Sequence, residues 1–249
     1  MVMDGRKQPE SERALHEIEH GKFLARGEAE TIWGWGSPAG ARRAEKRAAA
    51  ISEAAQLAPG VRALEIGCGT GLFTRLFVNT GAQVVANDIS AELIQRAQAA
   101  NPVVSFICAQ FEDLPETSTY DAIIGSSVIH HLDLSRALPK CHALLKPGGM
   151  MAFAEPNMLN PQVFAERTFL RKFLHYVSPD ETAFVRWSLA ATLRAQGFSD
   201  VMIQPFDWLH PAVPASLVNS VERLGGLLEK IPLVREFAGS LLISCRRPV

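Results

Sequence analysis

The feature that most constrains this chain is a glycine-rich turn, LEIGCGTG at residues 64–71, which follows an apolar run and precedes a helical pattern. Gly67, Gly69 and Gly71 allow the backbone to turn tightly and a ligand to approach the main chain closely. Their G-x-G-x-G spacing differs from the G-x-G-x-x-G of dinucleotide binders and from the phosphate loop G-x-x-x-x-G-K-[ST]. A strand, this turn and a helix in succession predict a ligand site at the carboxyl edge of an α/β sheet.

Apolar runs at 61–67, 83–88, 103–109, 120–126 and 149–155 alternate with helical patterns at 70–80, 91–100 and 135–145. Continuous apolar runs are typical of strands that are covered on both faces, so the alternation predicts a doubly wound α/β sheet. Ser90 is expected to cap the helix that follows it. Beyond residue 155 we expect insertions at 157–185 and 209–238, a helix that ends at Gly197, and two further strands at 200–209 and 239–247.

Composition and charge exclude several classes of protein. The 249 residues suit one large domain or one domain with an appendage. The net charge of −1 gives no global field that favours nucleic acid, and no apolar run is long enough to span a bilayer. The charged first residues do not resemble a secretory signal, and the four scattered cysteines have no C-x-x-C spacing. We therefore expect a reduced, cytoplasmic protein without zinc or disulfides.

Five stretches in order, ALEIGCGTGLFT, VVANDIS, FEDLP, YDAIIGSSVIHHL and LLKPGGMMAFAEP, resemble the successive motifs of class I S-adenosylmethionine-dependent methyltransferases. The resemblance covers residues 40–157, and it is to the small-molecule type, including quinone-precursor and sugar O-methyltransferases. It implies a seven-stranded, Rossmann-like sheet whose last strand is antiparallel, with the long insertion between the sixth and seventh strands.

The resemblance also implies S-adenosylmethionine as methyl donor, S-adenosylhomocysteine as product and no metal. Residues Glu65 to Gly71, Cys68 included, would wrap the methionine part of the donor, and Asp88 would hold its ribose. Ile89 would pack on the adenine, Phe111 would meet its edge, and Ser126 would supply a further contact. Gln110 stands where the family usually has aspartate; its carbonyl can still accept a hydrogen bond from the adenine amino group, although a purely structural role is an alternative.

An arginine on the helix before the glycine turn is a second feature that the resemblance implies. Arg47, or Arg43 one turn earlier, would pair with the donor's carboxylate, because a guanidinium donates two parallel hydrogen bonds. A solvated helix face is the alternative reading of this basic stretch.

The candidate catalytic residues are His130, His131 and Glu155. Adjacent histidines rarely converge on one metal ion, whereas a histidine suits removal of a hydroxyl proton. By resemblance to sugar enzymes, Glu155 would pair with one histidine; the alternative is that a histidine caps a helix or fills a polar pocket. His210 is a candidate to face the substrate, and the remaining histidines, including His20, are expected on the surface.

Three segments are candidates to cover the site: residues 1–40 as an N-terminal lid, and the insertions at 157–185 and 209–238 within a methyltransferase domain of residues 41–249. Trp33 and Trp35, in WGWGSP, would supply rigid apolar cover, or else clamp the N-terminus to the core. Most apolar residues of 209–238 are expected to pack against the sheet.

The function expected from the sequence is methylation of a small molecule, most directly on oxygen. N- or C-methylation and a non-catalytic S-adenosylmethionine-binding scaffold are the alternatives. The expected partner is the small-molecule substrate of a monomer or homodimer, without nucleic acid or stable membrane insertion.

Overall fold

The computed structural model describes residues 2–4, 12–116, 119–170 and 183–249. Their strands form one sheet in the order β1-β4-β3-β2-β5-β6-β8-β7. The strands are β1 (Val2–Asp4), β2 (Arg62–Ile66), β3 (Gln83–Asp88), β4 (Ser105–Cys108), β5 (Tyr120–Ser126), β6 (Leu145–Pro156), β7 (Ser199–Phe206) and β8 (Ser240–Arg246). The expected doubly wound sheet is confirmed, and β8 runs antiparallel to both β6 and β7. The unpredicted β1 adds an eighth strand beside β4.

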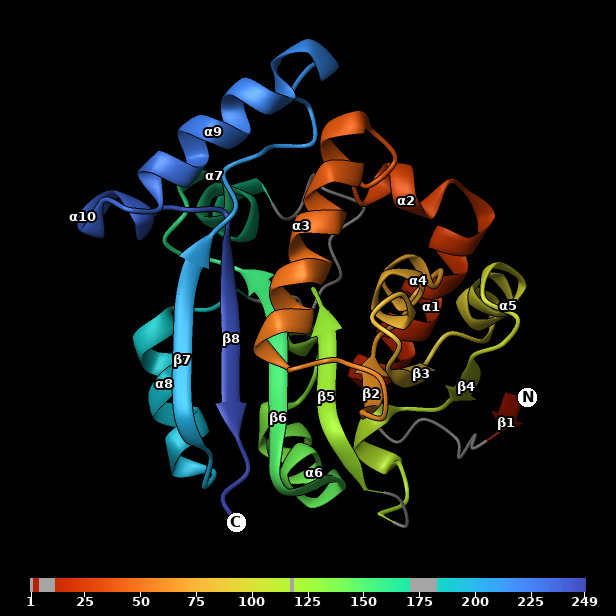
Figure 1. Cartoon of the computed structure of the whole chain (residues 1–249). Coiled ribbons are helices and arrows are strands. Elements are labelled where there is room, and N and C mark those ends of the chain that lie inside the picture. The colour runs from red at the N-terminus through yellow and green to blue at the C-terminus, as the bar shows by residue number, and fades with distance from the viewer. Residues whose placement is uncertain (1, 5–11, 117–118, 171–182) are drawn as a thin grey trace.

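Helices cover both faces of the sheet (Figure 1). On one face lie α3 (Pro38–Ala54), α4 (Leu72–Val78) and α5 (Ala91–Ala100), and on the other lie α6 (Leu134–Leu144) and α8 (Arg186–Ala195). Helix α1 (Glu12–Arg26) packs on α5 and continues through α2 (Ala29–Ile32) to α3. Short 3-10 turns in the described ranges follow strands or precede helices: η1 (Phe111–Asp113), η2 (Ile129–His131) and η5 (Ala215–Leu217).

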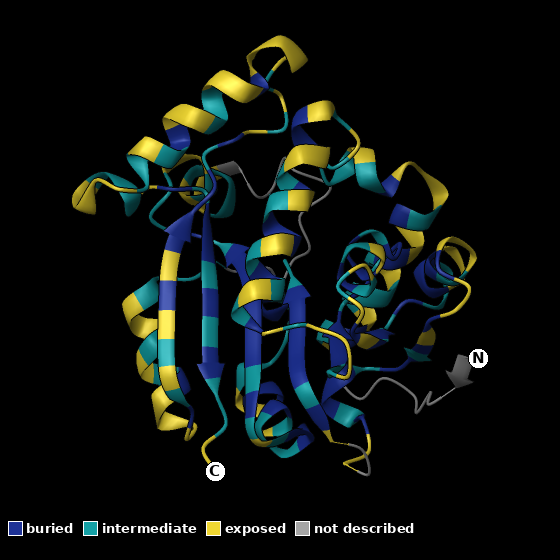
Figure 2. Cartoon of the chain, in the orientation of Figure 1, coloured by how far each residue is buried: buried dark blue, intermediate teal, exposed yellow. Residues whose placement is uncertain are grey.

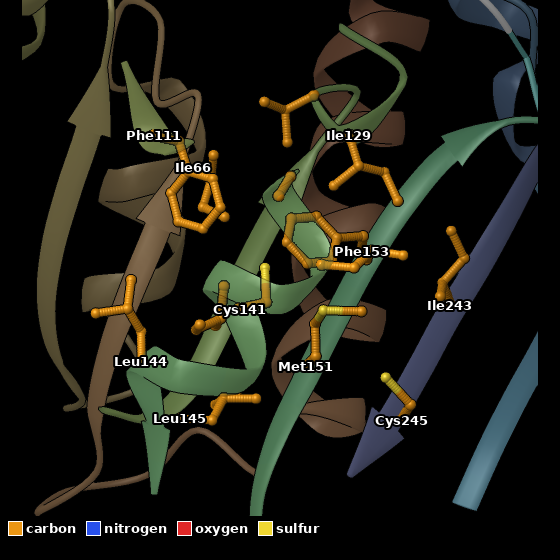
Figure 3. Packing of buried hydrophobic residues seen from close by; sticks show 14 of the residues in the cluster. Ile66, Phe111, Ile129, Cys141, Leu144, Leu145, Met151, Phe153, Ile243 and Cys245 are labelled. Atoms are coloured by element: carbon orange, nitrogen blue, oxygen red, sulfur yellow. The ribbon is translucent and has the colours of Figure 1, made fainter. Parts of the chain in front are cut away.

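Successive strand residues enter different hydrophobic layers, because side chains alternate across a sheet. Ala63, Ala122 and Ala152 face α3 and α4, and their small side chains let these helices lie close to the sheet. On the opposite face Met151 and Phe153 pack with α6 residues in a fully buried cluster (Figure 3). The central strands are dark blue throughout most of their length in Figure 2, as burial on both faces requires.

The predicted strands 83–88 and 120–126 match β3 and β5, and Ser90 caps α5 by accepting a hydrogen bond from the Leu93 N–H.

In the region of 157–185, α7 (Pro161–Ala165) is followed by one π-helical turn, η3 (Glu166–Leu170); residues 171–182 lie outside the described part. None of the described helices has the length and apolar character needed to cross a bilayer.

The expectation that residues 209–238 pack mostly against the sheet is wrong. Helices α9 (Val218–Leu228) and α10 (Pro232–Arg235) extend beyond the sheet's edge and are largely exposed (Figures 1 and 2). Leu224 is 56% exposed, Leu227 58% and Leu233 81%, whereas Val218 and Gly225 are the buried positions of α9. An amphipathic pattern fixes which residues share a helix face, but it does not fix what that face contacts.

Candidate functional site

A cavity of about 460 Å³ lies at the carboxyl ends of β2 to β5. The loops after these strands line it, as do α1, Ile32, Trp33 and Trp35. Strand β2 has β3 on one side and β5 on the other, so the chain reverses its winding direction at this point of the sheet. Ligands of open α/β sheets bind outside such a switch point.

The glycine turn forms the floor of the cavity. Gly67, Gly69 and Gly71 have φ values of 65°, 53° and 81°, a left-handed conformation that residues with a side chain rarely adopt. A Cβ on Gly67 would lie 2.3 Å from a Val128 methyl group, and one on Gly69 would lie 3.1 Å from the Trp33 ring. Gly67 and Gly69 line the cavity, whereas Gly71, which precedes α4, does not.

Asp88, at the end of β3, lies beside the turn. One carboxylate oxygen accepts a hydrogen bond from the Gly69 N–H at 2.8 Å, and the other accepts one from the Ser90 N–H at 2.9 Å. Burial raises the pKa of Asp88, although both N–H groups act to lower it. A carboxylate has about four acceptor positions, so two accepted bonds leave capacity for ligand hydroxyls.

Two residues near the ends of β4 and β5 each place a buried polar atom without a hydrogen-bond partner among the described residues on the cavity wall. These atoms are the Gln110 Oε1, after β4, and the Ser126 Oγ, at the end of β5. An unsatisfied buried acceptor or hydroxyl costs about 1 to 3 kcal/mol, which a ligand that pairs with it recovers. Ile89 and Phe111, which were predicted to contact adenine, also line the cavity.

Glu65 lies behind the turn and does not line the cavity. It is buried on the α4 side of the sheet, where the Thr74 hydroxyl donates to it at 2.6 Å. Burial raises the pKa of Glu65 to about 8, and the Thr74 hydrogen bond only partly opposes this. Cys68 lines the cavity, and burial raises the pKa of its thiol well above the ordinary value.

His130 and Glu155 form a buried pair next to the cavity. The His130 Nδ1 lies 2.5 Å from one Glu155 carboxylate oxygen, while the Val128 and Ile129 N–H groups donate to the other at 2.9 and 3.0 Å. Ser127, with a left-handed φ of 56°, makes the turn after β5 from which these two N–H groups reach the carboxylate. Burial favours a higher pKa for Glu155, but His130 and the N–H donors outweigh it and hold the pKa below its ordinary value.

An ionised Glu155 is only an acceptor, so the His130 Nδ1 carries the proton of this contact. The Nε2 is then the nitrogen that can accept a proton. His130 lines the cavity, whereas Glu155 is fully buried behind it.

Helix α1 brings polar residues to the cavity that the sequence reasoning missed. Arg13, Glu17 and His20 line it, so the expectation that His20 lies on the surface is wrong. Glu17 lies 3.1 Å from the Nδ1 of His131, a residue 114 positions away in the chain. Arg13, Glu17 and His20 are spaced four and three residues apart and therefore share one face of α1. Nothing in the sequence indicates what that face contacts.

Arg43, Arg47 and His210 do not line the cavity. The Arg47 side chain donates to the Ser240 hydroxyl, the Ser127 hydroxyl and the Ala154 carbonyl. Arg43 donates through two nitrogens to Asp207. His210 is exposed and lies 2.9 Å from the Gln162 side chain.

Trp33 and Trp35 line the cavity on its outer side. Trp33 packs with the cluster of Leu24, Ala29 and Leu93, and Trp35 lies edge-on to Phe73. The Arg43 and Arg47 guanidinium groups lie 5.3 and 5.5 Å from the Trp35 ring. Trp35 thus lines the cavity and contacts both arginines, which do not line it themselves.

No group of three or more His, Cys, Asp or Glu side chains in the described ranges is arranged to hold a metal ion. Around the glycine turn the polar groups of the cavity are the Asp88 carboxylate, the Gln110 amide, the Ser126 hydroxyl and main-chain amides, while α1 adds charged side chains. This chemistry suits a nucleoside with an attached polar tail.

Comparison with known proteins identifies a family for the central part of the chain. Residues 64–153 match the family described as "Methyltransferase domain". The ubiquinone biosynthesis O-methyltransferase of Nitrobacter winogradskyi is 34% identical over 166 residues, which are 59% of this chain and 62% of that protein. A Bradyrhizobium protein of the same name is 35% identical over 103 residues, 39% of this chain and 41% of that protein. The chain thus spans less than two thirds of these relatives.

A solved structure with the same fold extends the likeness to most of the chain. The N-methyltransferase NodS of Bradyrhizobium japonicum, solved with S-adenosyl-L-homocysteine, superposes with a TM-score of 0.63 at 15% identity, covering 94% of this chain and all of that one. At this identity the likeness concerns the fold alone.

Proposed function

We propose that the protein transfers a methyl group from S-adenosylmethionine to a hydroxyl oxygen of a small molecule, and the match of residues 64–153 to the family described as "Methyltransferase domain" supports this. The observation that carries the proposal is the cavity itself, where a glycine turn, Asp88 and unpaired acceptors lie opposite the His130–Glu155 pair. The names of the relatives favour oxygen as the acceptor atom.

The residues present fit the donor. Asp88 has acceptor capacity for the ribose hydroxyls, and the Gln110 Oε1 is a buried acceptor in need of a donor such as the adenine amino group. The glycine turn leaves its main chain accessible to the polar tail, and the Ser126 hydroxyl supplies a further donor. When bound, S-adenosylmethionine supplies a methyl group already activated by its sulfonium charge.

The chain's part in the chemistry is to align the acceptor and to take its proton. Glu155 accepts from the His130 Nδ1 and so fixes the ring with Nε2 as the basic nitrogen. An acceptor hydroxyl in the cavity donates to this nitrogen and loses its proton there. The carboxylate stabilises the imidazolium that forms, because opposite charges at this distance favour the charged histidine.

The cover of the site excludes water from the reaction. Within residues 1–40, we propose that the part from α1 to Trp35 acts as a lid, since α1, Trp33 and Trp35 line the cavity, whereas β1 pairs with β4 in the sheet. Trp33 lies over the glycine turn, where its ring contacts the position of Gly69.

An assay with defined acceptors tests the proposal. The protein is incubated with S-adenosylmethionine and either catechol, as a quinone-precursor-like diphenol, or aniline, and the products are identified by mass spectrometry. We expect O-methylated catechol. Methylation of aniline alone would assign the protein to N-methylation instead, and donor binding without any product from either probe or from a cell extract would favour a non-catalytic scaffold.

The histidine pair has its own test. Replacing His130 and His131 together by alanine should leave the Kd for S-adenosylmethionine unchanged and remove turnover, because neither residue is assigned to the donor. The Kd is measured by calorimetry and turnover by product formation. Undiminished turnover in this variant would contradict the role of the pair as base.

A further inference from the structure

Arg47 of α3 is buried beside the site, although it does not line the cavity. Its Nη2 donates to the Ala154 carbonyl at 2.8 Å and to the Ser127 hydroxyl at 3.2 Å. Its Nη1 donates to the Ser240 hydroxyl at 2.8 Å and lies 3.6 Å from the Asp207 carboxylate. One guanidinium group therefore joins α3 to β6, to β8 and to the turn after β5.

The two residues that accept from the Arg47 Nη2 flank the buried catalytic pair. Ala154 directly precedes Glu155, and Ser127 begins the turn that carries His130. The Ser127 N–H also donates to the Ala154 carbonyl, at 2.8 Å. From this turn two N–H groups and the His130 Nδ1 reach the Glu155 carboxylate. A single nitrogen thus ties together the backbone segments that carry the two members of the pair.

The backbone around Arg47 adopts conformations that need external support. Ser127 has a φ of 56° and Asp207 one of 75°, left-handed values that are uncommon for a residue with a side chain. Both residues contact Arg47, and such conformations persist only where the surrounding contacts hold them. Val128, the next residue in the turn, packs against the position of Gly67. The placement of the turn therefore also sets its distance from the glycine turn.

We propose that Arg47 is a positioning residue, whose guanidinium group holds the Ser127 turn against the end of β6 and so keeps His130 in contact with Glu155. Its effect on methyl transfer rests on the proposed function. This role differs from the one that the family resemblance implies for Arg47, which is a direct contact with the donor's carboxylate. Loss of a positioning residue lowers kcat, whereas loss of a donor contact weakens the binding of S-adenosylmethionine.

The contact between His130 and Glu155 has a spectroscopic signature that needs neither donor nor acceptor. A proton held between an imidazole nitrogen and a carboxylate oxygen 2.5 Å apart makes a strong, charge-assisted hydrogen bond and resonates far downfield in the ¹H NMR spectrum. We expect this resonance in the wild type, where its absence from His130→Asn assigns it, and its loss or upfield shift in Ser127→Ala and Arg47→Lys. Ser240→Ala, which removes the other hydroxyl bonded to the same guanidinium group, is the matched control and should keep it.

Turnover distinguishes the positioning role from a role in donor binding. Arg47→Lys should lower kcat about tenfold to hundredfold, because one ammonium group cannot reproduce the forked contact and a small misplacement of the reacting groups costs this much. The Kd for S-adenosylmethionine, measured by calorimetry, should stay unchanged in this variant. Ser240→Ala should retain the wild-type kcat.

A double-mutant cycle assigns the effect of Ser127 to its bond with Arg47, which is necessary because Ser127 also lines the cavity. Ser127→Ala alone should lower kcat. The Arg47→Lys, Ser127→Ala double variant should have no lower a kcat than Arg47→Lys, since both changes break the same hydrogen bond.

A weaker Kd for the donor with a normal kcat in Arg47→Lys would assign Arg47 to the donor and overturn the positioning role. The same conclusion would follow from a wild type without the downfield resonance, from its survival in either Ser127→Ala or Arg47→Lys, from its loss in Ser240→Ala, or from kcat losses that multiply in the double variant. If Arg47→Lys does not fold, the resonance in Ser127→Ala, compared with Ser240→Ala, decides the role. Absence of transfer by the wild type would instead overturn the proposed function, and the resonance would still test Arg47.

Discussion

Gln110 is the residue at which this chain departs from the pattern of the family it resembles, and its side chain lies on the cavity wall. Its Oε1 is buried and has no hydrogen-bond partner among the described residues. A neutral amide can make the hydrogen bond to an adenine amino group that an aspartate makes in the family, without bringing a second charge near Asp88.

Replacing Gln110 by alanine should therefore weaken donor binding. The expected loss is about 1 to 2 kcal/mol, or roughly fivefold to thirtyfold in Kd, because one buried hydrogen bond disappears. Calorimetric titration with S-adenosylhomocysteine measures it. An unchanged Kd would show that Gln110 has only a structural role.

Glu155 links the site to the pH dependence of stability. Its pKa in the folded protein lies below the ordinary value of 4.5, so the unfolded chain takes up this proton first as the pH falls. The stabilisation is complete above the ordinary pKa and is lost as the pH drops through the folded value.

The Glu155→Gln variant should lose this part of the acid sensitivity. Urea unfolding at pH 7 and at pH 4 should show a smaller difference in unfolding free energy for the variant than for the wild type. At pH 7 the variant should be less stable by about 1 to 3 kcal/mol, since the bonds to a buried charge are weakened. Equal pH dependence in the two proteins would contradict the assignment.

At the scale of elements, α3 is tied to the antiparallel end of the sheet by a buried charge cluster. Asp207, after β7, accepts from Arg43 at 2.8 Å and lies 3.6 Å from Arg47, both on α3. Burial lowers the pKa of Arg47 to about 10, and Asp207 opposes this shift. Two arginines share one carboxylate here, so its charge is needed to hold both.

Changing Asp207 to asparagine should lower the free energy of unfolding by about 3 kcal/mol, because it leaves buried guanidinium groups without their counterion. Thermal or urea denaturation measures the loss. Glu222→Gln, which weakens the exposed pair with Arg42, is the matched control and should cost less than about 1 kcal/mol. Equal losses in the two variants would contradict the importance of the buried cluster.

Trp33, in the segment that joins α2 to α3, lines the cavity, and the proposed lid gives it a testable role. Trp33→Ala should raise the donor KM and lower kcat while the melting temperature falls by only a few degrees, since about 1 kcal/mol corresponds to roughly 2–4 °C in a chain of this size. Trp187→Ala, on α8 and 56% exposed, should change neither. A large fall in melting temperature with normal kinetics would make Trp33 a clamp and not part of a lid.

Local patterns predicted those parts of the fold that local chemistry decides. Strands β3 and β5 match their apolar runs, and Ser90 caps α5 as its hydroxyl allows. The contact between Glu17 and His131 could not be predicted in this way, because it joins residues 114 positions apart through the packing of α1. The exposure of Leu224 and Leu227 could not be predicted either, because the same apolar stripe occurs on helices that face a core and on helices that face solvent.

At the scale of the whole molecule, the sheet brings every part of the site to one edge. The glycine turn, Asp88, Gln110 and His130 follow four different strands, and they meet because parallel strands end at the same edge. The resemblance gave this arrangement from motif order alone. The methyl acceptor could not be predicted in this way, because the segments expected to contact it match no motif.

The central claim is that this cavity binds S-adenosylmethionine and that the protein passes its methyl group to a small molecule. The most direct measurement is incubation of the purified protein with methyl-deuterated S-adenosylmethionine and a small-molecule extract of the organism that makes it, followed by mass spectrometry. We expect one labelled product, formed in an amount equal to S-adenosylhomocysteine and absent in the His130→Ala, His131→Ala double variant. An extract in which no small molecule acquires the label would contradict it.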